Sequence, residues 1–200
     1  MRNAPGPVRL TLILVKRELR GLFLSPLAWV ILTLLLLVQG YAFYLLLELC
    51  NHPKGPPGPM LNYFFGGSFF YWLFVIAVIS LLTMRSLAGE RRLGTLDMLL
   101  AAPVGETPVV AGKYIAALLF YTFLWAPTVA HVVLAARLGG AADPGAVAAG
   151  YLGTLALGAA ALSLGLLCSS ITRSQLLSGI ATFSLLGAFL QLGPLELFIQ

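Results

Sequence analysis

The chain has 200 residues, of which 60% are hydrophobic and 10% are charged, and its formal net charge is +5. Soluble domains carry about 25% charged residues, so composition excludes a soluble fold, which could not keep this much apolar surface from water. Apolar runs of about 20 residues, long enough to cross ~30 Å of hydrocarbon, predict an all-α polytopic membrane protein. The basic residues flank these runs and form no stripe, which favours orientation in a bilayer over nucleic-acid binding.

Residues 1–26 are predicted to be a cytoplasmic N-terminus containing an amphipathic helix. Apolar residues recur at three- and four-residue steps from Val8 to Leu22, and a basic side accompanies them. Such a helix suits the membrane interface, near anionic head groups. The alternative is a simple extension of the first span, although Pro26 marks a break before that span. The basic residues of this interfacial helix are Arg9, Lys16, Arg17 and Arg20.

Five transmembrane helices are predicted, over about residues 27–47, 63–83, 114–136, 146–167 and 176–192. Aromatic residues at 63–65 suit one membrane interface, and Pro127 predicts a kink in the third span. Small residues recur every fourth position in the last two spans, which predicts close helix packing there. The alternative is that Gly and Ala are simply common in membrane helices. The leucine-rich first span is expected to face lipid.

The distribution of Lys and Arg orients the spans. With the N-terminus in the cytoplasm, ten of these residues lie inside and two, Lys54 and Arg137, lie outside. This is a strong positive-inside bias. Residues 85–113 then face the cytoplasm. The inner residues are Arg2, Arg9, Lys16, Arg17, Arg20, Arg85, Arg91, Arg92, Lys113 and Arg173.

Residues 85–113 form the main polar interruption and carry seven of the 19 charged residues. From Leu87 onward, leucines alternate with charged residues. This pattern predicts a short amphipathic helix or helix pair on the cytoplasmic surface, loosened at Gly94–Thr95 and ended near Pro103. Physical reasoning allows two uses, a membrane-surface anchor or a lever gripped by a soluble partner.

Catalytic and cofactor sites are not indicated. Neither His52 nor His131 is near a plausible serine or cysteine nucleophile, and His131 has no acidic residue within a helical turn. No Cys/His cluster suggests a metal site. Gly112-Lys113 lacks the Ser or Thr and the first glycine of a phosphate-binding loop. The chain is therefore expected to be no enzyme and to bind no cofactor itself. No charged residue lies deep in a span, which argues against a proton relay or ion-coupled carrier.

The string ERRLGTLDMLLAAPV (90–104), followed by Gly112-Lys113, resembles the ABC-2 type permeases, the transmembrane subunits of ABC exporters. The segment KREL (16–19) and the connection SSITRSQ (169–175) add to the resemblance, which is greatest to the gliding-motility and copper-enzyme-maturation types. It implies a coupling helix that docks on a cytoplasmic ATPase subunit, with the 169–175 turn nearby. The family also has a sixth span and a cytoplasmic C-terminus. This chain stops before both, as a fragment truncated before a sixth span would.

By this resemblance, we expect a single transmembrane domain over residues 1–200 that acts as the permease subunit of an exporter in a prokaryotic inner membrane. Its partners would be an ATPase subunit holding ATP and magnesium, a second permease chain, identical or different, and the lipid bilayer. The alternatives are a non-transport scaffold that recruits a cytoplasmic partner, a membrane-embedded enzyme or secondary carrier, and a haem-exporter-like permease. The expected ATPase contacts are Glu90, Arg91, Arg92, Gly94, Thr95, Leu96, Asp97, Leu100 and Arg173.

Overall fold

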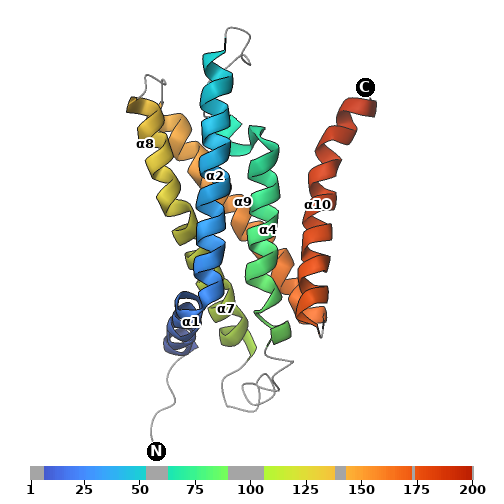
Figure 1. Cartoon of the computed structure of the whole chain (residues 1–200). Helices are drawn as coiled ribbons and strands as arrows, with labels where there is room; N and C mark the ends of the chain where they lie inside the picture. Colours follow the sequence, from blue (N-terminus) through green and yellow to red (C-terminus); the bar gives the residue numbers. More distant parts are fainter. Residues whose placement is uncertain (1–6, 53–62, 90–105, 138–142, 173, 200) are drawn as a thin grey trace, which may run out of the picture.

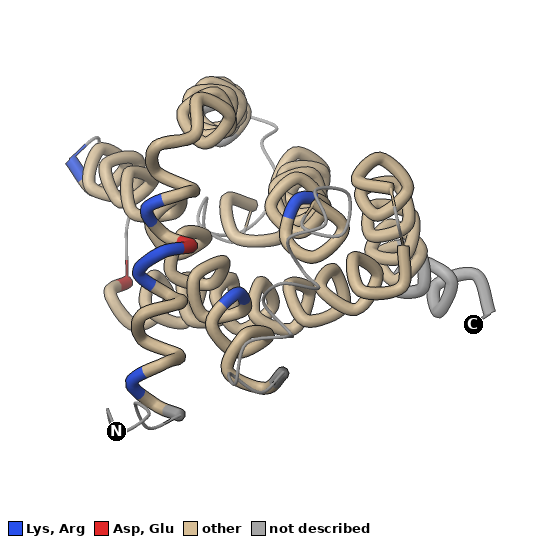
Figure 2. Tube along the Cα trace, turned by 90° about the horizontal axis from the view of Figure 1, so that it is seen from below, with Lys and Arg blue, Asp and Glu red and all other residues tan. Residues whose placement is uncertain are grey.

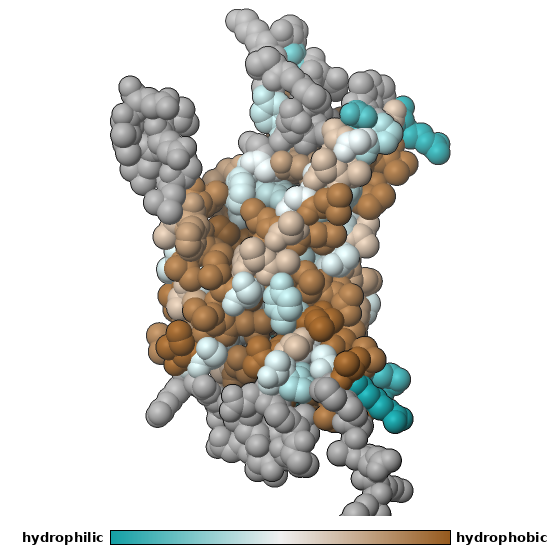
Figure 3. Space-filling view, turned by 180° about the vertical axis from the view of Figure 1, so that it is seen from behind, coloured by the Kyte–Doolittle hydropathy of each residue, from teal (hydrophilic) through white to brown (hydrophobic). Residues whose placement is uncertain are grey.

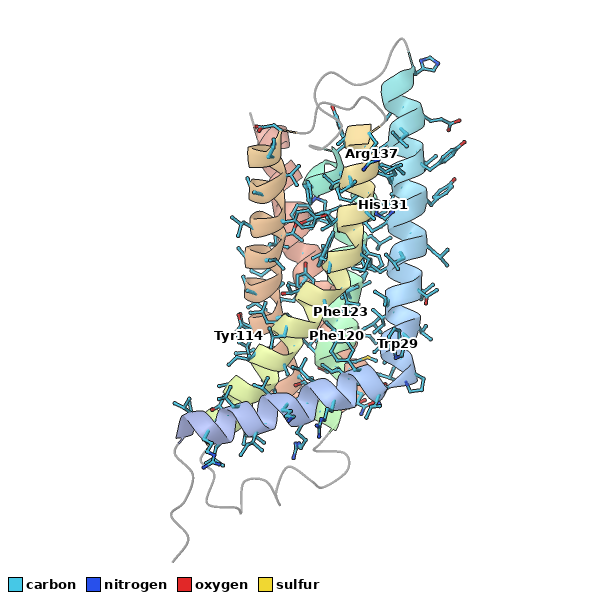
Figure 4. All side chains as sticks on the ribbon, turned by 90° about the vertical axis from the view of Figure 1, so that its left-hand side faces the viewer. Trp29, Tyr114, Phe120, Phe123, His131 and Arg137 are labelled. Carbon is cyan, nitrogen blue, oxygen red and sulfur yellow. The ribbon has the colours of Figure 1, made fainter. Side chains whose placement is uncertain are left out.

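The computed structural model describes residues 7–52, 63–89, 106–137, 143–172 and 174–199. Within these ranges the structure is helical and contains no strand, which confirms the predicted all-α class. Most helices stand side by side, and α1 crosses beneath them at one end (Figures 1 and 4). The long helices are α1 (Pro7–Leu24), α2 (Pro26–Asn51), α4 (Phe69–Met84), α7 (Glu106–Trp125), α8 (Val129–Arg137), α9 (Pro144–Ile171) and α10 (Gln175–Ile199).

Proline sets two of the bends that the sequence predicts. Ser25 is extended, with φ −76° and ψ 126°, and Pro26 begins α2, so α1 turns away from the first span instead of extending it. Pro127 lies in the short 3₁₀ helix η2 (Ala126–Thr128), which joins α7 to α8. The missing amide of proline removes a helical hydrogen bond at this point. The predicted kink is therefore confirmed.

Three helices are long and apolar enough to cross a membrane: Pro26–Leu49, Thr107–Arg137 and Pro144–Ile171. Two shorter apolar helices, Phe69–Met84 and Gln175–Leu190, accompany them. The three long helices confirm a multi-pass arrangement, and the count of five spans stays a prediction. Figure 3 shows a broad hydrophobic band between more hydrophilic ends, as expected for a chain that spans a bilayer.

The second span begins later than the sequence suggests. Residues 63–67 form the irregular turn η1 (Tyr63–Gly67), in which Gly66 has a φ of 98°. Glycine adopts this left-handed conformation readily because a glycine residue has no Cβ atom. Trp72 Nε1 donates to the Gly66 carbonyl at 2.7 Å and so closes the turn onto α4. Regular helix therefore starts only at Phe69.

The packing of α9 bears out the predicted role of its small residues. Gly158 and Gly165 are buried, and a Cβ built on either would lie within 3 Å of Tyr121 or Thr83 side-chain atoms. These glycines thus let α7 and α4 approach α9 closely. The helix also extends to Ile171, so the predicted connection over residues 168–175 is shorter than expected: Cys168 and Ser169 belong to α9.

The α2 helix is the peripheral member of the bundle. Trp29, Leu37 and Tyr41 are each more than half exposed. On the opposite side of the helix, Ile31 and Leu35 are buried in the main apolar core. This division agrees with the expected lipid-facing first span. Gln39, the one amide of this helix, is 2% exposed and therefore faces the protein interior.

Candidate partner-binding surface

The basic side chains gather at the α1 end of the bundle. Figure 2 views this end, where the described cations lie on α1, at the end of α4 and near the start of α7. Arg137 lies at the opposite end (Figure 4). The apolar bundle between them separates a basic end from a sparsely charged one. The cations of the basic end are Arg9, Lys16, Arg17, Arg20, Arg85 and Lys113.

The last described residues before the segment 90–105 are firmly held at this end of the bundle. Ser169 Oγ accepts hydrogen bonds from the backbone amides of Leu87 at 3.2 Å and of Ala88 at 3.1 Å. All three residues are buried, and Ser169 has no exposed surface. A helix-terminal hydroxyl on α9 therefore fixes the chain immediately before the segment.

The corner between α9 and α10 lies against the same stretch. A Cβ built on Gly89 would be 2.9 Å from Gln175 Nε2, so these two residues are in close contact. Ser169 and Gln175 bracket the α9–α10 connection. The family resemblance implies that residues 90–100 and the 169–175 turn approach the same partner. Residues 87–89, which precede the first segment, do contact Ser169 and Gln175.

Helix α7, which follows the segment in the chain, begins earlier than predicted. Residues 106–113, expected to belong to the loop, form the first turns of α7, which begins at Glu106. Gly112 packs on α1, where its Cβ would lie 2.9 Å from Leu14 Cβ. Helix α1 packs chiefly against α7. Helix α1 therefore supports the start of α7, which follows the segment in the chain.

A partly buried ion pair joins α1 to α7. Lys113 Nζ lies 3.2 Å from Glu18 Oε1, and the lysine side chain is 3% exposed. The same carboxylate oxygen is 2.9 Å from an Arg17 guanidinium nitrogen. Sequence reasoning counted Lys113 among the loop charges and did not single out Glu18. The sequence does show that Glu18 is the one acidic residue of this basic helix. It could not show that Glu18 pairs with Lys113, because the two are 95 residues apart in the chain.

The interfacial helix keeps its basic side in the open. Arg9, Lys16, Arg17 and Arg20 are all exposed, as predicted. The apolar side is divided, because Val15 is 7% exposed whereas Val8 is 74% exposed. Part of the predicted apolar face is therefore buried by the bundle and its beginning is exposed, and its place at a membrane interface stays a prediction.

The predicted ATPase contacts themselves lie outside the described residues, so their role stays a prediction. They are Glu90, Arg91, Arg92, Gly94, Thr95, Leu96, Asp97, Leu100 and Arg173.

Other chemistry is sparse in the described part of the chain. There, no group of three or more His, Cys, Asp or Glu side chains is placed to hold a metal ion. His131 packs its ring against Phe43, with centroids 5.1 Å apart, which suits the predicted packing role. The basic end, with its two fixed flanks, is thus the most distinctive polar surface.

Comparison with known protein families shows to which family this chain belongs. The family model described as ABC-2 family transporter protein matches residues 12–199. The chain belongs to the ABC-2 family. No curated protein and no solved structure matches it. The match covers α1, the bundle and both flanks of the 90–105 segment, and it confirms the resemblance that the sequence showed. As an ABC-2 protein, the chain is a membrane-embedded transporter permease subunit, and membership of this family implies in general a cytoplasmic ATPase partner.

Proposed function

We propose that this ABC-2 permease is half of an exporter in a prokaryotic inner membrane, with its N-terminus in the cytoplasm. Two permease chains and two ATPase chains form the working unit. ATP and magnesium are held by the ATPase, and this chain has no hydrolytic site of its own. The substrate path lies where the two permease chains meet.

The proposed contact with the ATPase is the segment 90–105, together with Arg173. What supports it is the fixing of both ends of the segment: Leu87 and Ala88 on Ser169, and Lys113 on Glu18. A displacement of the segment would be transmitted to α4, α9 and α7, because packed elements move as units. A segment attached at only one end would absorb the displacement instead.

In this proposal, closure of the ATPase dimer pushes the segment, and the spans reorient around the substrate path. The charged residues Glu90, Arg91, Arg92 and Asp97 dock on the ATPase. Charge pairs across such a contact set register and specificity. The excess of cations at the basic end supports its cytoplasmic placement, since positively charged loops stay inside.

The test is the stimulation of ATP hydrolysis in nanodiscs containing the permease and its ATPase. The double variant Arg91→Glu/Arg92→Glu is expected to abolish stimulation by the permease, because reversing two charges turns attraction into repulsion. Arg137→Glu, at the opposite end of the bundle, is the control and should leave stimulation intact. Unchanged stimulation in the double variant would remove this assignment.

Orientation has a separate test. With Cys50 and Cys168 replaced by Ser, a cysteine introduced by Thr95→Cys should resist an impermeant maleimide applied to intact cells and react once the membrane is opened. Labelling from outside would place the segment on the wrong face. A complex that binds the ATPase but shows no nucleotide-driven change in the spans would favour the scaffold alternative.

A further inference from the structure

A cavity of about 350 Å³ lies where α1 meets α2, α4 and α7 at the basic end. One part of its wall is charged, with Arg17 and Glu18 from α1, Arg85 from the end of α4, and Lys113 from α7. The other part is apolar and is formed by side chains of the spans, among them Ala28, Ile31, Leu82 and Phe120. The cavity thus joins a polar mouth to an apolar interior.

The charged part carries an excess of positive charge. Among the residues that the structure describes, three cations and one carboxylate line it, a formal net charge of +2, and the other polar side chains there are the neutral Ser25 and Ser86. Glu18 is shared between Arg17 and Lys113. The guanidinium of Arg85 donates to the Ser25 hydroxyl at 3.3 Å, which brings no negative charge. An anion is the chemical complement of such a mouth.

The apolar part and the position of the cavity identify the kind of anion. The mouth is lined in part by α1, which crosses the end of the spans (Figure 4), and the apolar wall is formed by residues of α2, α4 and α7. A free anion would use only the mouth. A phospholipid presents a phosphate to the cations and an acyl chain to the apolar wall.

We propose that this cavity binds one anionic phospholipid of the inner leaflet, with its phosphate at Arg85 and Arg17 and an acyl chain beside Ala28 and Phe120. The lipid completes the joint between the interfacial helix and the spans. Arg85 immediately follows α4 and stands just before Leu87, so the bound head group lies beside the first fixed flank of the 90–105 segment. The binding does not depend on the cargo or on the ATPase.

The test is a lipid titration of the purified full chain in a neutral detergent, followed by native mass spectrometry. Dioleoyl phosphatidylglycerol should bind more tightly than dioleoyl phosphatidylcholine. Arg85→Gln should weaken phosphatidylglycerol binding about fivefold, the effect of one cation near a membrane surface. Arg20→Gln is the matched control, because Arg20 is an exposed cation of α1 that does not line this cavity.

A second variant tests the apolar wall. Ala28→Leu adds volume inside the cavity and should lower phosphatidylglycerol binding while the protein stays monodisperse. Equal loss in Arg20→Gln and Arg85→Gln would show general surface attraction and overturn the proposal. Competition by inorganic phosphate as effective as that by a short-chain phosphatidylglycerol would assign the mouth to a free anion and also overturn it. Equal affinity for the two dioleoyl lipids would do the same.

Discussion

Gly158 is the position where packing in this bundle can be tested most sharply. A Cβ there would lie 2.2 Å from Tyr121 Cε1 and 2.6 Å from Tyr121 Cζ, whereas ordinary contact begins at 3.4 Å. Tyr121 has no exposed surface, and its hydroxyl donates to the Thr154 carbonyl at 3.4 Å. The ring also contacts Trp125 edge-on. It therefore has little room to move.

Gly158→Ala is expected to lower the free energy of unfolding by about 1–3 kcal/mol, the usual cost of forcing an extra carbon into a packed interior. The magnitude follows from the shortfall of about 1.2 Å between Cβ and the ring, which must be met by shifting α7 against α9. Gly153→Ala is the matched control on the same helix, because nothing lies within 4 Å of its Cβ. The control should not be destabilised.

The assay is unfolding by sodium dodecyl sulfate in mixed micelles, followed by circular dichroism. A third variant, Tyr121→Leu in the Gly158→Ala background, removes the ring that the new methyl group meets. The double-variant cycle should give a coupling of at least ~1 kcal/mol in the direction of relief. If Gly158→Ala and Gly153→Ala unfold alike, the argument that small residues on α9 set the helix spacing is refuted.

Three other contacts give predictions of graded size. Ser169→Ala removes the acceptor for two buried amides and should cost about 1–3 kcal/mol, with faster amide exchange at Leu87 and Ala88; Ser163→Ala, whose exposed hydroxyl bonds only within its own helix, is the control and should exchange as the unmodified chain does. Glu18→Gln and Lys113→Met should show a coupling free energy of ~1–2 kcal/mol in a double-variant cycle, because the lysine is buried beside the carboxylate; additive effects would contradict a direct pair. Tyr71→Phe should cost only ~0.6 kcal/mol, typical of hydrogen bonds between membrane helices, since Thr154 keeps its bond to the Gly150 carbonyl; a loss above ~2 kcal/mol in the unfolding assay would mean that polar contacts, not packing, dominate.

The functional surface could be anticipated from the sequence only in outline. The described cations do gather at one end, as the sequence predicted, because charge patterns are local. The role of the charged segment after Leu87 stays a prediction. The identity of the fixed flanks was not anticipated. The sequence places Ser169 in the SSITRSQ connection, whereas in the structure its hydroxyl accepts from two amides because α9 packs against the end of α4.

The boundaries of the second and third spans differ from expectation for a related reason. Residues 63–67 contain three aromatic side chains and no charged residue, so the sequence pattern continued the span through them. The φ of 98° at Gly66 breaks that continuity. Conversely, the polar residues 106–113 suggested a loop, but packing of Gly112 against Leu14 makes helix favourable there.

By itself, the sequence determined that this is a helical membrane protein, where its prolines bend it, and which end is basic. These properties depend on composition and on neighbours within one or two turns. The tertiary structure decided which charged side chains form ion pairs and which aromatic rings pack against the glycines of α9. Lys113 meets Glu18 across 95 residues, and Gly158 receives Tyr121 from another helix. Such pairings follow from the way helices pack side by side, and no local spacing encodes them.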